Sequence, residues 1–86
     1  MEQLSLFQME AAIRKPKFLV LEQVKVQLMD EEIDSETHYY RKFYEPHIIN
    51  KVGEVLQIII TTKAITYEVD IYGTRYYLLE EELVGL

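Results

Sequence analysis

Thr66-Tyr67-Glu68-Val69-Asp70-Ile71-Tyr72 (TYEVDIY, residues 66–72) decides the fold class, because apolar and polar side chains alternate along it without a break. A period of two is typical of a β-strand with one buried face. The side chains expected to face inward are Tyr67, Val69 and Ile71, and those expected outward are Thr66, Glu68 and Asp70. Gly73-Thr74 then predicts a tight turn, and Arg75–Leu79 returns as a second antiparallel strand.

Strand-like sequence also lies on the N-terminal side of this hairpin. Phe18–Leu28 (FLVLEQVKVQL) predicts a half-buried strand, with alternate apolar residues on one face. That apolar face consists of Val24, Val26 and Leu28. Ile48–Thr62 is rich in β-branched residues and predicts a long strand with a bend or bulge at Gly53.

The connections and the C-terminal segment complete the prediction of a mostly β protein. Asp30–Glu36 (DEEIDSE) holds five acidic side chains in seven positions, so it is expected to be an exposed connection. Glu80–Leu86 predicts a single helical turn that leads to a last short strand. Four to five short antiparallel strands, with a long loop after the first, favour a small and strongly curved barrel.

The first residues differ from the rest of the chain. Gln8–Lys15 contains good helix formers, and Pro16 ends any helix there because its ring clashes with the preceding turn. About two turns of helix are marginally stable alone. We therefore divide the chain into a short flexible or helical N-terminal tail, residues 1–17, and a barrel domain, residues 18–86.

Composition limits the classes of function. The 86 residues carry a formal charge of −6, which disfavours direct binding to a phosphate backbone, and they include no cysteine, which excludes disulfides and thiolate metal sites. Neither a membrane-spanning apolar run nor a basic signal peptide is apparent. A small acidic cytoplasmic protein is expected.

Four short segments carry a resemblance to a known fold: Val24–Val26, Asn50–Val55, Tyr67–Asp70 and Leu79–Leu83. Together they resemble an SH3-like barrel, in particular the KOW-type and nitrile-hydratase-β-type small barrels. The resemblance covers residues 18–86 and implies a closed barrel of four to five strands. It names no function, because such barrels serve many.

The pentapeptide Gln3-Leu4-Ser5-Leu6-Phe7 (QLSLF) is the most specific motif in the chain. It resembles the motif by which bacterial replication and repair proteins dock on the β sliding clamp of DNA polymerase III, and it matches that pattern at every position. The resemblance implies that Leu6 and Phe7 fill an apolar pocket and that Gln3 hydrogen-bonds beside it, with Leu4 on the rim and Ser5 as a spacer. A competing interpretation is an amphipathic helix that packs Leu4 and Phe7 on the barrel.

The segment Tyr39–Tyr44 is the one basic and aromatic cluster, and it is predicted to be a candidate ligand loop. Its residues are Tyr39, Tyr40, Arg41, Lys42, Phe43 and Tyr44. Bases stack on tyrosine while arginine and lysine meet phosphates, so single-stranded nucleic acid is one interpretation. We favour the other, in which the rings pack one end of the barrel beside the acidic run.

Candidate catalytic and metal-binding residues are few. His38 and His47 each follow a glutamate by two residues, which is not a recognised ligand spacing, and no metal or cofactor is predicted. Ser35 and His38 beside Asp34 lack the glycine-containing elbow of a nucleophile site. We therefore expect no enzyme.

The sequence thus predicts a non-enzymatic accessory factor or inhibitor of replication, plausible for a phage or other mobile element, that docks on the sliding clamp. The alternative is a protein- or nucleic-acid-binding barrel that uses the Tyr39–Tyr44 segment.

Overall fold

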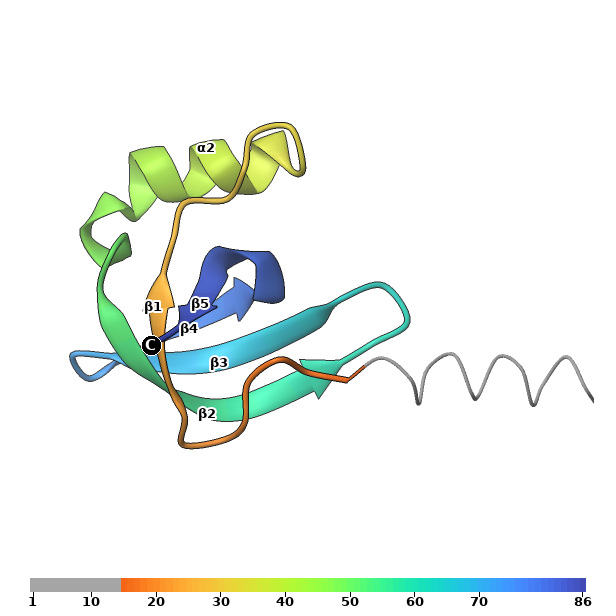
Figure 1. Ribbon diagram of the computed structural model, residues 1–86. Coiled ribbons are helices and arrows are strands. Elements are labelled where there is room, and N and C mark those ends of the chain that lie inside the picture. The colour runs from red at the N-terminus through yellow and green to blue at the C-terminus, as the bar shows by residue number, and fades with distance from the viewer. Residues whose placement is uncertain (1–14) are drawn as a thin grey trace, which may run out of the picture.

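The computed structural model describes residues 15–86, which form five antiparallel strands in one sheet and one short α-helix (Figure 1). The strands are β1 (Gln23–Val26), β2 (Val52–Ile60), β3 (Ile65–Ile71), β4 (Thr74–Leu79) and β5 (Leu83–Gly85). The helix α2 (Ser35–Tyr44) and the 3₁₀ turn η1 (Pro46–Ile48) lie between β1 and β2, and a second 3₁₀ turn, η2 (Glu80–Glu82), precedes β5. The predicted mostly β class is confirmed.

The β3–β4 hairpin forms as the alternation predicted, within one residue at the turn. Tyr67 pairs with Leu78 and Ile71 with Thr74. Tyr72 and Gly73 connect the strands with φ values of 53° and 88°, the positive values that a tight hairpin turn of type I′ requires at both central residues. The inward positions are buried, as predicted.

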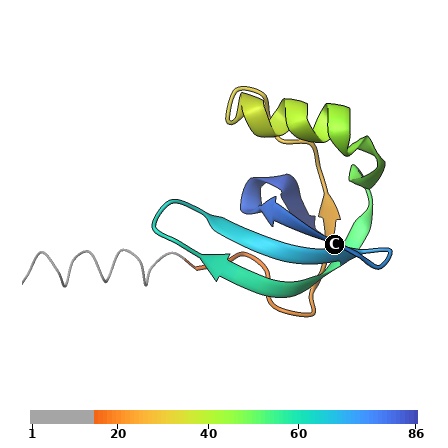
Figure 2. The ribbon, with the colours of Figure 1, turned by 180° about the vertical axis from the view of Figure 1, so that it is seen from behind.

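The strand order is β4-β3-β2-β1-β5, so β4 and β5 are the two edges. Figures 1 and 2 show that the sheet curves strongly and that α2 lies on the side of η2 and β5, away from β2. Within residues 15–86 no ladder joins β4 to β5. The sheet is established, and its closure into an SH3-like barrel stays a prediction.

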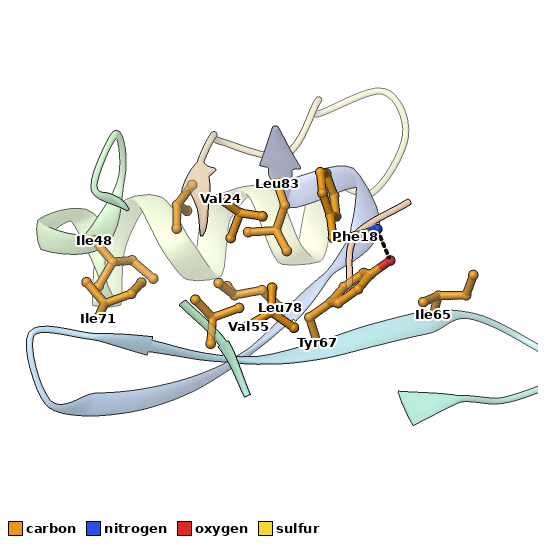
Figure 3. Close-up of a cluster of buried hydrophobic side chains, with 11 residues drawn as sticks. Phe18, Val24, Ile48, Val55, Ile65, Tyr67, Ile71, Leu78 and Leu83 are labelled. Carbon is orange, nitrogen blue, oxygen red and sulfur yellow. Dashed lines mark hydrogen bonds between the residues drawn. The ribbon is translucent and has the colours of Figure 1, made fainter. Parts of the chain in front are cut away.

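The core lies in the hollow of this curved sheet (Figure 3). Its buried side chains are Phe18, Val24, Val26, Ile48, Val55, Ile65, Tyr67, Val69, Ile71, Leu78 and Leu83. Each large apolar side chain buried in this way contributes about 1.5–3 kcal/mol. In Figure 3, Ile48 and Ile71 lie at one end and Ile65 at the other, next to Phe18 and Tyr67. The rings of Phe18 and Tyr67 meet edge to face at 5.5 Å between their centres.

The first predicted strand is too long. Only Gln23–Val26 forms β1, because the chain turns immediately before it: the Glu22 amide donates to the carbonyl of Leu19 at 3.0 Å, and Leu21 has a φ of 75°. Such a positive φ is incompatible with a strand. Phe18 nevertheless reaches the core from this irregular segment.

The second predicted strand begins later than expected. Pro46 starts the 3₁₀ turn η1, and Asn50 has a φ of 70°, so the extended backbone of β2 begins at Val52. The predicted bulge at Gly53 is also wrong, since the shift of register falls between Val55 and Gln57. Gly53 has another role. A Cβ there would lie 2.7 Å or less from Val69 Cγ1, the Asp70 carbonyl and Ile71 Cγ1.

One residue of β3 contradicts the predicted alternation. Glu68 was expected outward in solvent, but only 7% of it is exposed. Gln57 and Tyr77 lie opposite it on the neighbouring strands, and Arg75 Nη1 is 3.5 Å from its carboxylate. The outward face of β3 is therefore partly covered by its own sheet.

We predict that Gly53→Ala destabilises the domain by about 1–3 kcal/mol, because the added methyl group has no space and the backbone must shift. Gly85→Ala is the matched control. There a Cβ would meet only Phe18 Cε1, at an ordinary 3.5 Å. Urea unfolding of both variants measures the difference, and equal midpoints would contradict the close packing of β2 on β3.

Candidate functional site

The predicted clamp-binding residues Gln3, Leu4, Ser5, Leu6 and Phe7 lie outside the described residues. The docking interpretation and the packed-helix interpretation of this peptide therefore both stay predictions. The structure describes the contacts of the chain from Lys15 onward and the conformation of the second candidate segment, Tyr39–Tyr44.

The segment Tyr39–Tyr44 is helical, so the predicted loop is wrong: these residues form the C-terminal part of α2. The helix begins where the acidic run ends, because Asp34 caps it. Asp34 Oδ1 accepts a hydrogen bond from the Thr37 amide at 3.1 Å, and Oδ2 accepts one from Thr37 Oγ1 at 2.7 Å. The side-chain bond and then the backbone bond to Thr37 hold the pKa of Asp34 below its ordinary value.

Arg41 attaches α2 to the sheet. Its Nε donates to Glu82 Oε1 at 2.8 Å, its Nη2 donates to the Tyr77 carbonyl at 2.7 Å, and its Nη1 bonds to Glu45 one turn on. Glu82 is fully buried, and its Oε2 accepts the Leu79 amide at 2.9 Å. One guanidinium thus connects the helix, edge strand β4 and η2.

The charges of this cluster stabilise each other. Burial opposes the charge on Arg41, but hydrogen bonds and opposite charges, first from Glu82 and then from Glu45, hold the pKa of the guanidinium above its ordinary value. The local i,i+4 spacing of Arg41 and Glu45 is visible in the sequence. The pairing with Glu82 is not, because nothing distinguishes Glu82 from its two neighbouring glutamates.

The aromatic side chains of α2 point away from the core, so the favoured prediction that they pack one end of the barrel is wrong. No residue of α2 is buried. The exposed fractions are 40% for Tyr39, 51% for Tyr40, 67% for Phe43 and 73% for Tyr44. Helical spacing puts these four residues on one side, and Arg41 on the other. We call the four together the aromatic face.

The rings of the aromatic face pair along the helix. Tyr39 stacks on Phe43 at 5.9 Å between centres, and Tyr40 meets Tyr44 at 5.3 Å. Cations of the same helix lie over two of the rings: the Arg41 guanidinium carbon is 5.4 Å from the centre of Tyr40, and Lys42 Nζ is 6.0 Å from that of Phe43. The face is thus a preformed aromatic platform within reach of positive charge.

Carboxylates border the platform at its N-terminal end. The Tyr39 hydroxyl donates to Glu31 of the acidic run, and this hydrogen bond, with the charge of Glu31, raises the pKa of Tyr39. Asp30, Glu32 and Glu36 belong to the same stretch and are exposed. The aromatic face therefore lies in an acidic setting.

The two histidines are engaged separately. His38 Nδ1 lies 2.7 Å from the Met29 carbonyl, and His47 Nε2 lies 3.1 Å from the Tyr76 hydroxyl. Asp34, the neighbour that suggested nucleophile chemistry, is engaged as the helix cap. Among residues 15–86 no three histidine or acidic side chains are grouped to hold a metal ion.

The buried hydroxyl group of Tyr67 hydrogen-bonds to the backbone at the start of the domain. Tyr67 O–H donates to Glu80 Oε2 at 2.6 Å and accepts from the backbone amides of Lys17 at 3.0 Å and Phe18 at 3.4 Å (Figure 3 draws the last). Burial first, and then the bond to Glu80, raise the pKa of Tyr67 to about 12. This network holds the backbone at Lys17 and Phe18 against the sheet.

A cavity of about 330 Å³ lies close to this entry point. It is lined by Lys15, Lys63, Ala64, Ile65, Leu79, Glu80 and Glu81. The two cations are matched by two carboxylates, and one of these, Glu80, is already bonded to Tyr67. The lining therefore provides no excess of charge for a ligand.

No protein-family model matches the chain, and neither the curated proteins nor the solved structures contain a match. None of the helices within residues 15–86 has the length and apolar character needed to cross a bilayer.

We predict that Arg41→Met destabilises the domain by about 3–5 kcal/mol, because it leaves the Glu82 carboxylate buried without its cation. The double variant Arg41→Met with Glu82→Met should lose less than the sum of the two single changes. Arg75→Met is the control, since Arg75 is largely exposed and its pair with Glu68 contributes about 1 kcal/mol or less. A double-mutant cycle from urea unfolding measures the coupling, and strict additivity would contradict the pairing.

We also predict a loss of stability at high pH. Tyr67 keeps its proton up to about pH 12 in the folded chain but titrates near 10 when unfolded, so its contribution is complete below pH 10 and is lost as the pH rises toward 12. The full loss is about 2–3 kcal/mol. Unfolding free energies measured between pH 9 and pH 11 should fall more steeply for the wild type than for Tyr67→Phe. Tyr72→Phe, at an exposed position, should retain the wild-type slope.

Proposed function

We propose that this protein is a non-enzymatic accessory factor that docks on the bacterial β sliding clamp through Gln3–Phe7. The observation that carries the proposal is the pentapeptide QLSLF, which matches the clamp-binding pattern at every position. The network of Tyr67 with Lys17 and Phe18 marks where the described domain begins, ten residues after the peptide ends.

The expected affinity follows from the two apolar anchors. Leu6 and Phe7 each contribute about 1.5–3 kcal/mol when fully desolvated, and ordering the peptide on the clamp offsets part of this. The balance is typical of micromolar, exchangeable binding. Such binding suits a factor that recruits its own domain to the cytoplasmic replication machinery or displaces a polymerase from the same pocket, as a phage or mobile-element protein does.

The domain in this proposal is a small barrel similar to the SH3-like, KOW-type and nitrile-hydratase-β-type folds. The strand order supports it, because β5 lies beside β1, and β1 to β4 follow in succession. The fold does not define the function, so the docking peptide carries the assignment.

Purified clamp tests the proposal directly. The full chain should bind it with a micromolar dissociation constant, and Leu6→Ala with Phe7→Ala should weaken binding at least about 100-fold, since two anchors are removed together. Tyr72→Ala with Leu86→Ala removes two exposed apolar side chains of the domain and is the matched control. The proposal fails if the anchor variant binds as the wild type does, or if neither binds. A polymerase competition assay then separates recruitment from inhibition.

A second candidate function is favoured by the exposure of the aromatic face. Four aromatic side chains on one side of a helix, none of them buried, form a surface suited to a macromolecular partner. A barrel that binds a protein or nucleic acid through residues 39–44 retains its partner when residues 1–8 are deleted. A clamp-docking protein loses its partner on the same deletion.

A further inference from the structure

We infer that the aromatic face of α2 binds a basic, amphipathic segment of a partner protein, with the partner's apolar side chains on the rings and its lysines and arginines toward the acidic run. This inference rests on the second candidate function and is independent of clamp docking. It names the partner by its chemistry: apolar and cationic together.

The first step is that α2 is inverted relative to an ordinary surface helix, which turns its apolar side toward the core. Here the inward contacts are polar: Arg41 with Glu82, and His38 with the Met29 carbonyl. The apolar rings face outward, and they are not needed to hold the helix in place. A partner can therefore cover the aromatic face without disturbing how α2 is attached.

Charge determines which partner fits. Asp30–Glu45 carries six carboxylates against two cations, and one of the cations, Arg41, is already held by Glu82 and Glu45. Phosphate groups brought to this surface would meet mainly negative charge, which disfavours nucleic acid. A cationic segment is attracted by the carboxylates. Two of the rings already have a cation of the same helix beside them, so the rings offer the partner mainly apolar contact.

The balance of charges also disfavours two other candidates for this surface, a second copy of the chain and its own residues 1–14. A second copy would bring an equally acidic surface against this one, in a chain whose formal charge is already −6. Residues 1–14 contain one cation, Arg14, and two carboxylates, so they do not provide the complement either. A separate basic protein segment is the occupant that both the rings and the charges favour.

The geometry of the rings favours a peptide over a small ammonium ligand. Tyr39 and Phe43 are nearly parallel, with an angle of 13° between their planes, and the Tyr40–Tyr44 pair extends the surface along the helix. Rings in such rows form a platform, whereas a cage for one ammonium group needs rings around it. A helix laid along α2 would use the whole platform.

A synthetic helical peptide of leucine and lysine, with its leucines on one face, is the probe. Its charge-reversed counterpart of leucine and glutamate and an oligothymidylate are the comparisons. The full chain should bind the leucine–lysine peptide, measured by fluorescence anisotropy, with amide shifts in α2 followed by NMR. Binding to the other two should be at least about tenfold weaker, and added salt should weaken the complex.

Two variants test the surface itself. Phe43→Ser with Tyr44→Ser keeps every charge and should weaken peptide binding at least about tenfold, while Tyr72→Asn removes an exposed ring elsewhere and should leave it unchanged. Glu32→Gln with Glu36→Gln keeps the rings and should also weaken binding. Leu6→Ala with Phe7→Ala should have no effect, so this inference and clamp docking fail separately.

Four results would overturn the inference. Peptide binding that survives Phe43→Ser with Tyr44→Ser would show only general attraction to an acidic protein. Tighter binding of oligothymidylate would assign the surface to nucleic acid. A dimer that this double variant dissociates, without peptide binding, would assign it to a second copy. Absence of binding to the leucine–lysine peptide would contradict the proposed preference for a basic, amphipathic partner.

Discussion

The ion pair of Arg41 with Glu82 is the interaction on which the arrangement of this domain depends. Glu82 is fully buried in this pair, and the remaining hydrogen bonds of Arg41 reach Glu45 and the Tyr77 carbonyl. Apolar burial holds the sheet together, but it does not hold α2, none of whose residues is buried. The helix is therefore positioned by charge and hydrogen bonding, which depend on geometry far more than apolar contact does.

This mode of attachment explains why the surface of α2 has its unusual character. In a helix held by apolar contacts, the tyrosine side chains would be buried against the core. Because Arg41 fixes the position instead, four aromatic side chains are left outside, beside a run of carboxylates. The aromatic face is thus separate from the Tyr67 network, which holds the backbone at Lys17 and Phe18 against the sheet.

Strand alternation and turn residues were sufficient to predict the β3–β4 hairpin, since both are local properties of residues 66–79. The limits of β1 and β2 were not predictable in the same way. They depend on positive φ values at Leu21, a residue type that rarely adopts them, and at Asn50, a type that adopts them more often but also occurs widely in other conformations. The segment Tyr39–Tyr44 was singled out by its composition, but neither its helical form nor the exposure of its rings was predicted, because aromatic composition suggests burial and the Arg41–Glu82 contact, 41 residues apart, leaves no local signal. The clamp-binding role of Gln3–Phe7 stays a prediction.

The same ion pair constrains how the protein can diverge. Loss of Arg41 leaves the Glu82 carboxylate buried without a cation, whereas loss of Glu82 leaves Arg41 paired with Glu45 alone, so either single substitution is less stable than the intact pair. Positions 41 and 82 should consequently change together or not at all. The attachment of α2 places no such constraint on the residues that carry its rings. Among related sequences, the residues at positions 41 and 82, which attach the helix, would covary, and the residues on its outer surface would vary independently of each other.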